Sequence, residues 1–152
     1  MRICSYSDVL LGMDHGSSLL EAAVAMPLLL AILLGAVDFG RGYFLAMEIA
    51  GAANAGAEYG SQNPTDIAGM RTAATGDATD VPNLVASASY GCECSDGSSF
   101  SDSCAVTPSC ATNVAYRVTV NVSTVYTPQF PWPGIPSAIP LSSSATMRGG
   151  GN

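Results

Sequence analysis

The residue types needed for catalysis are sparse in this sequence. The one histidine, His15, lies near the start of the chain, far from the polar C-terminal half. A serine-type triad needs a histidine between its nucleophile and its acid. The H-E-x-x-H motif of zinc peptidases and the glycine-rich phosphate-binding motif are also missing from the sequence. We therefore expect a protein that is not an enzyme and that needs no cofactor.

Cysteines form the one dense cluster of reactive side chains. Four of the five cysteines fall within nineteen residues of one another, at Cys92, Cys94, Cys104 and Cys110. Their C-x-C and C-x5-C spacings differ from the paired C-x2-C of structural zinc sites, so we expect no metal. Two disulfides in an oxidising compartment are the expected outcome. A bridge from Cys92 to Cys94 would be strained, so each should pair with Cys104 or Cys110, in either combination.

A single carboxylate, Glu21, stands at the edge of a long apolar run. No charged residue occurs from Ala22 to Val37. A carboxylate at the edge of a membrane-embedded segment is costly and asks for a reason. One reason is local, because Ser18-x-x-Glu21 has the spacing of a helix capping box. The other is a partner in another protein.

The apolar run has the length of a membrane span. Residues 17–37 meet the requirement of about 20 mainly apolar residues, with Pro27 inside the expected helix. The helical pattern continues to Gly60 and contains a stripe of small residues, Ala46, Ala50, Ala53, Ala57 and Gly60. Such a stripe allows a close neighbour. We expect that neighbour to be the chain's own sheet, with a helix of another subunit as the alternative.

The C-terminal half carries strand signals. Val114–Tyr126 alternates apolar and polar residues, and Ser87–Cys94 and Leu141–Arg148 are its expected partners. The predicted fold is therefore α+β: a long N-terminal transmembrane and assembly helix, then a small disulfide-linked head with a three-stranded antiparallel sheet. A short second helix should begin after Asp66. The segment Thr127–Pro140 holds five of the nine prolines and should be an extended connection.

Charge excludes one class of partner. The chain has twelve acidic and five basic residues and a net charge of −7. Proteins that bind nucleic acid need a basic face. We therefore expect no nucleic-acid partner.

The sequence GSSLLEAAVAMP at 16–27, followed by DFGR at 38–41, carries a family signature. It resembles the N-terminal signature of TadE-like proteins, the minor pilins or pseudopilins of bacterial tight-adherence (Flp-type) pilus systems. The resemblance implies a leader of residues 1–16, a helix of residues 17–60 with a transmembrane part at 17–37, and an extracytoplasmic head of residues 61–152. It also implies a single-pass protein of the bacterial inner membrane, with its head in the periplasm and a place in a pilus.

The same resemblance gives roles to four residues. A prepilin peptidase would cleave between Gly16 and Ser17. Glu21 would then be the fifth residue of the mature chain and would pair with the amine of Ser17 on a neighbouring pilin subunit. Pro27 would belong to the same assembly helix. The membrane, other pilus subunits and the peptidase are therefore the implied partners.

A different class of protein shares the overall layout. Residues 1 to about 36 could serve as an ordinary signal peptide, releasing a small disulfide-bonded binding or enzymatic domain. Against this, a signal peptide has an apolar core of about 7–15 residues, whereas the helical pattern here runs on to Gly60.

Overall fold

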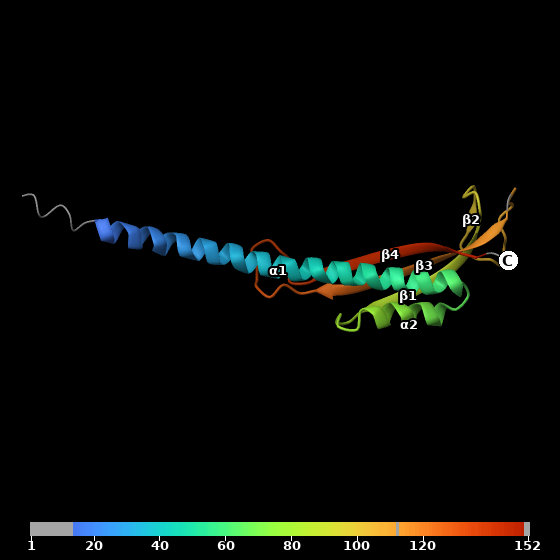
Figure 1. Cartoon of the computed structure of the whole chain (residues 1–152), viewed down its shortest axis with the longest axis horizontal. Coiled ribbons are helices and arrows are strands. Elements are labelled where there is room, and N and C mark those ends of the chain that lie inside the picture. The colour runs from blue at the N-terminus through green and yellow to red at the C-terminus, as the bar shows by residue number, and fades with distance from the viewer. Residues whose placement is uncertain (1–13, 112, 151–152) are drawn as a thin grey trace, which may run out of the picture. The chain divides into compact units, whose positions relative to one another are not determined.

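The computed structural model describes residues 14–111 and 113–150 and gives an α+β chain (Figure 1). The predicted leader, residues 1–16, lies mostly outside the described residues. The chain divides into two compact units, Met1–Phe39 and Gly40–Asn152. Its elements, in order, are α1 (Asp14–Gln62), α2 (Ile67–Asp77), β1 (Val85–Cys94), β2 (Phe100–Ser101), β3 (Val114–Tyr126) and β4 (Ile139–Gly149).

The head contains one antiparallel sheet of four strands in the order β2-β1-β3-β4. The prediction of three strands was wrong by one. The additional strand, β2, pairs Ser101 with Cys92 and Phe100 with Glu93. Two residues are too few to show an alternating pattern, so β2 depends on the path of the cysteine-rich loop rather than on its own sequence.

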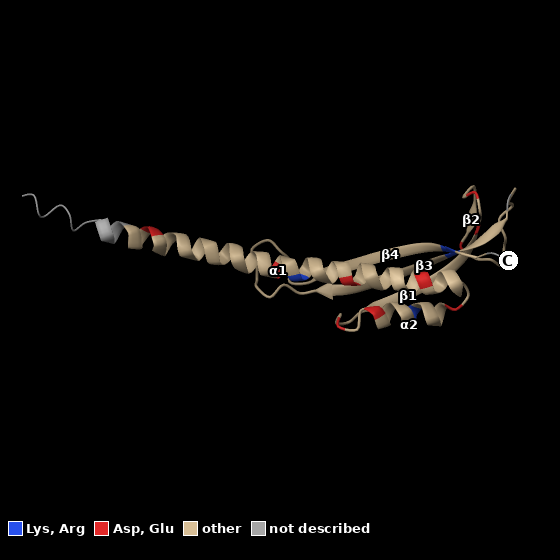
Figure 2. Cartoon of the chain, viewed as in Figure 1, with Lys and Arg blue, Asp and Glu red and all other residues tan. Residues whose placement is uncertain are grey.

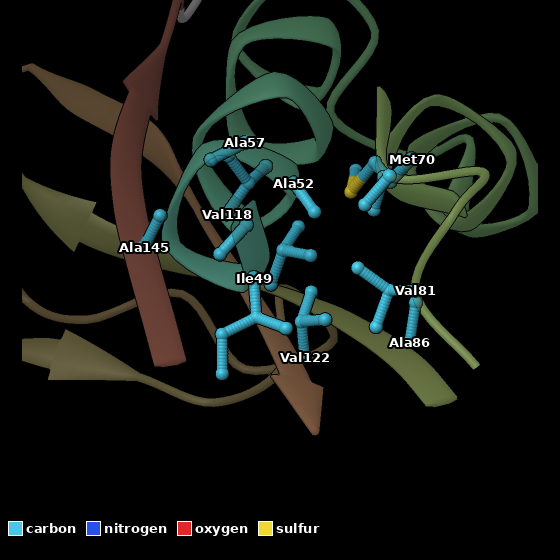
Figure 3. Packing of buried hydrophobic residues seen from close by; sticks show 13 residues of the cluster. Ile49, Ala52, Ala57, Met70, Val81, Ala86, Val118, Val122 and Ala145 are labelled. Carbon is cyan, nitrogen blue, oxygen red and sulfur yellow. The ribbon is translucent and has the colours of Figure 1, made fainter. Parts of the chain in front are cut away.

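The core lies between one face of the sheet and the helices. Val118, Val120 and Val122 on β3 are fully buried, as their alternation predicts. Ala53 and Ala57 of α1 are fully buried in the same cluster, together with Met70 of α2. Figure 3 shows Ala57 and Met70 within this cluster. The small-residue stripe of α1 therefore packs beneath the chain's own sheet.

Close contact of α1 with its neighbours depends on Gly56. A Cβ atom placed on Gly56 would lie 2.9 Å from the carbonyl oxygen of Met70 and 3.0 Å from Val120 Cγ1. Real Cβ atoms essentially never show the first distance, and the second is tighter than most real Cβ contacts. Only a residue without a side chain lets α1 approach α2 and β3 this closely.

The second helix begins where the sequence predicts. The side chain of Asp66 accepts a hydrogen bond from the backbone N–H of Gly69 at 2.9 Å, as an N-cap residue does. The Tyr59 hydroxyl donates to Asp66 at 2.8 Å. The cap thereby ties the start of α2 to α1.

Candidate assembly site

The N-terminal part of α1 presents apolar side chains to its surroundings. Consecutive residues such as Leu28, Leu29 and Leu30 are all at least half exposed, so the apolar surface encircles the helix. By length and composition, the described part of α1 is long and apolar enough to cross a membrane. A helix that is apolar all round needs cover from lipid or protein. The large apolar residues exposed on this part of α1 are Leu19, Leu20, Val24, Met26, Leu28, Leu29, Leu30, Ile32, Leu33, Leu34 and Val37.

Glu21 is exposed at the N-terminal end of this apolar surface. Figure 2 shows that a long uncharged stretch of α1 follows the described acidic position nearest its N-terminal end. No described residue forms a hydrogen bond or an ion pair with it. Because α1 begins at Asp14, Ser18 lies within the helix and is not its N-cap. The capping-box interpretation of Ser18 and Glu21 is therefore wrong for the full-length chain, in which residues 1–16 are still attached. A buried carboxylate at this position would need a partner from outside the described chain.

Pro27 lies inside α1. Proline has no N–H, so it cannot donate the helical hydrogen bond to the carbonyl of Ala23. A neighbouring helix, a side chain or a water molecule usually satisfies such a carbonyl in a membrane helix. Pro27 thus leaves an acceptor two residues after Glu21 in the sequence.

The predicted processing site falls near the start of the described chain. Gly16 and Ser17 both have helical backbone in α1. The bond between them therefore lies within a helix in the full-length chain.

The four clustered cysteines form two bridges at one end of the sheet. Cys92 is joined to Cys104, and Cys94 to Cys110. The disulfide-linked head predicted from the sequence is confirmed, and the pairing that was left open is now specified. The bridges fix the loop after β1 to the strand, so they position β2. Among the described residues, no group of three or more histidine, cysteine or acidic side chains is placed to hold a metal ion.

An ionic cluster beside the bridges was missed in the sequence. Glu93 is buried, and its carboxylate accepts a hydrogen bond from Arg148 Nε and lies 3.7 Å from Arg117 Nη1. Arg117 and Arg148 are directly opposite each other on β3 and β4. Like charges in that position repel, and Glu93 contacts both arginines as the compensating charge.

The sequence contains part of the information that predicts this cluster, but the strand register is also required. Arg117 falls on the polar face of β3, as the alternation predicts, but the sequence does not say which β4 residue faces it. The side chain of Arg117 also lies over the ring of Phe100, with 5.1 Å from Cζ to the ring centroid. Phe100 belongs to the strand that the sequence did not predict. The cluster therefore helps to hold β2 on the sheet.

Comparison with protein families identifies a similarity in the N-terminal region. Residues 16–58 match the family model described as TadE-like protein. This region is similar to TadE-like proteins. The matched TadE-like segment contains Gly16, Ser17, Glu21 and Pro27, and it ends within the small-residue stripe of α1.

The match confirms the resemblance inferred from the sequence. TadE-like proteins are a pilus structural family that is not known for enzymatic activity, so the match points to a component related to the tight-adherence pilus. No curated protein and no solved structure matched the chain. The head after residue 58 is outside the TadE-like match.

Proposed function

We propose that this protein is a membrane-anchored, pilin-like structural component of a bacterial tight-adherence pilus or a related secretion apparatus. The observation that carries the proposal is the TadE-like match over 16–58, on a helix that is apolar all round and carries one carboxylate at its edge. Residues 17–37 span the inner membrane once. The head, residues 61–152, lies in the periplasm or in the assembled pilus, and the protein acts by assembly, not by chemistry.

Glu21 is the assembly residue in this proposal. A prepilin peptidase removes residues 1–16, and Ser17 becomes the N-terminus. The amine of Ser17 in one subunit then pairs with the Glu21 carboxylate of its neighbour. A buried ion pair contributes little net stability, but it can specify register between helices. Pro27 belongs to the same interface, where a neighbouring subunit satisfies the free carbonyl of Ala23.

The disulfides support a head outside the cytoplasm. Bridges such as Cys92–Cys104 form and persist in oxidising compartments, of which the periplasm is one. The net charge of −7 and the location of the few arginines support partners other than nucleic acid.

Substitution of Glu21 tests the proposal. Glu21→Ala should leave membrane insertion unchanged, because it removes a charge from an apolar segment. Incorporation into sheared pili should fall strongly, since the subunit loses its register contact. The measurement is the amount of the protein in the membrane fraction and in the pilus fraction of the same cells.

The matched control is Glu58→Ala, which removes an exposed carboxylate from the part of the same helix that packs on the sheet. It should leave both fractions unchanged. Equal pilus incorporation of Glu21→Ala and Glu58→Ala would show that Glu21 has no role in assembly.

A further inference from the structure

We propose that the proline-rich connection between β3 and β4, residues 127–138, lies in the lipid headgroup layer, with Trp132 and Phe130 as its anchors. This inference rests on the proposed function, because it takes residues 17–37 as the membrane span. It adds a second contact between the protein and the bilayer, made by the head itself.

The connection starts beside the part of α1 that follows the predicted span in the sequence. Tyr126, the last residue of β3, packs against α1 at Gly42: a Cβ atom on Gly42 would lie 3.2 Å from Tyr126 Cε1. Gly42 follows Val37, the end of the span, by five residues, or about 7.5 Å of helix. The headgroup region on each side of a bilayer is roughly 5–7 Å thick. The connection therefore begins at the outer edge of that region.

The two ends of the sheet differ in charge. The connection joins the strands at the end marked by the Tyr126–Ile139 pair, whereas the bridges and the Glu93 cluster are near the opposite end, at Cys94–Val114 (Figure 1). No charged residue occurs from Thr127 to Leu141. The charged cluster and the uncharged connection thus lie at opposite ends of the sheet.

The side chains of the connection are those that favour a membrane interface. Phe130 is 43% exposed, and its ring meets the Trp132 ring edge to face with centroids 6.5 Å apart. Tryptophan and tyrosine are enriched where hydrocarbon meets water. On α1, Tyr43 is 71% exposed and Arg41 is exposed, so an aromatic and a basic side chain occur at the same level.

The backbone of the connection is also suited to a poorly hydrated layer. An unpaired N–H group is costly away from water. Pro128, Pro131, Pro133 and Pro136 have no N–H, which removes four donors from this short segment. Proline also restricts the chain before it binds, so less conformational entropy is lost on contact with lipid.

Trp132 is the one tryptophan in the chain and is therefore a built-in probe. The full-length protein is reconstituted in phosphatidylcholine vesicles, and its tryptophan emission is recorded with lipids brominated high on the acyl chain and with aqueous acrylamide. We expect strong quenching by the brominated lipid, weak quenching by acrylamide, and a blue shift relative to the unfolded chain. Flotation of the same vesicles reports whether the chain is anchored.

Two variants sharpen the experiment. Phe130→Ser should reduce quenching by brominated lipid, because it removes the neighbouring anchor without changing the probe. Phe100→Ser removes a similarly exposed ring from β2, at the far end of the sheet, and should leave the quenching unchanged.

Three outcomes would contradict the proposal. Failure to float would overturn the proposed anchor itself. Flotation with quenching by acrylamide alone would leave the anchor and overturn the lipid contact. Flotation with Trp132 shielded from both quenchers would mean that protein, such as a second subunit, covers the connection.

Discussion

At the scale of single residues, the Asp66 cap gives the head a defined response to acid. The backbone N–H of Gly69, then the Tyr59 hydroxyl, hold the pKa of Asp66 below its usual range. A depressed pKa stabilises the folded state above the unfolded pKa, about 3.9, and this contribution is lost as the pH falls through the folded value. The same hydrogen bond raises the pKa of Tyr59.

Asp66→Asn should therefore remove part of the acid sensitivity of the head. Asparagine keeps a capping oxygen but does not titrate. The wild type should exceed the variant in stability at neutral pH, and the difference should shrink below a pH of about 4. Thermal unfolding of the full-length protein in nanodiscs, repeated over a pH series, measures this. A constant difference at every pH would contradict the account.

Glu93 is the residue whose loss should affect the disulfide end most. In Glu93→Gln the repulsion between Arg117 and Arg148 is no longer compensated. We expect a loss of about 1–2 kcal/mol in the free energy of unfolding, reduced because both arginines are partly exposed. Asp102→Asn, in the exposed loop beside it, is the control and should change stability by less than about 0.5 kcal/mol. Denaturant titration of both variants in nanodiscs compares them, and equal values would contradict the role of Glu93.

At the scale of elements, the close packing of α1 on the sheet makes Gly56 intolerant of any side chain. Gly56→Ala should cost about 1–3 kcal/mol, because the added methyl overpacks the contact with Met70, Ala74 and Val120. Gly76→Ala in α2 is the control, since a Cβ there meets nothing within 4 Å. The control should be as stable as the wild type or slightly more stable, because alanine favours helix. Equal destabilisation of the two variants in the same denaturant titration would rule out the packing explanation.

At this scale, the sequence predicted the elements that have strong periodic patterns. It did not predict short elements or features that depend on strand register. The alternation in β3 and the small residues of α1 each repeat often enough to indicate which face is buried. The two residues of β2 have no such repeat, and their position depends on bridges to Cys104 and Cys110. The Glu93 cluster depends on the β1–β3 and β3–β4 registers, which the sequence does not specify. The roles of Gly16, Ser17 and Glu21 come from the family signature, since composition alone would allow an ordinary signal peptide.

At the scale of the whole molecule, the two units have different requirements. Met1–Phe39 has little buried surface of its own within the described residues and needs lipid or other subunits. Gly40–Asn152 has its own core, two disulfides and a four-stranded sheet. The helix α1 belongs to both units, which is the arrangement that an anchored assembly subunit needs.

The mass of the mature protein tests this account most directly. Cells are separated into membrane, periplasm and medium, and the intact protein is purified from each fraction under non-reducing conditions. The account predicts a membrane-bound or pilus-bound chain that begins at Ser17, retains residues 17–37 and carries both disulfides. A head released into the medium, with its N-terminus near residue 37, would contradict it and would identify the N-terminal helix as a signal peptide.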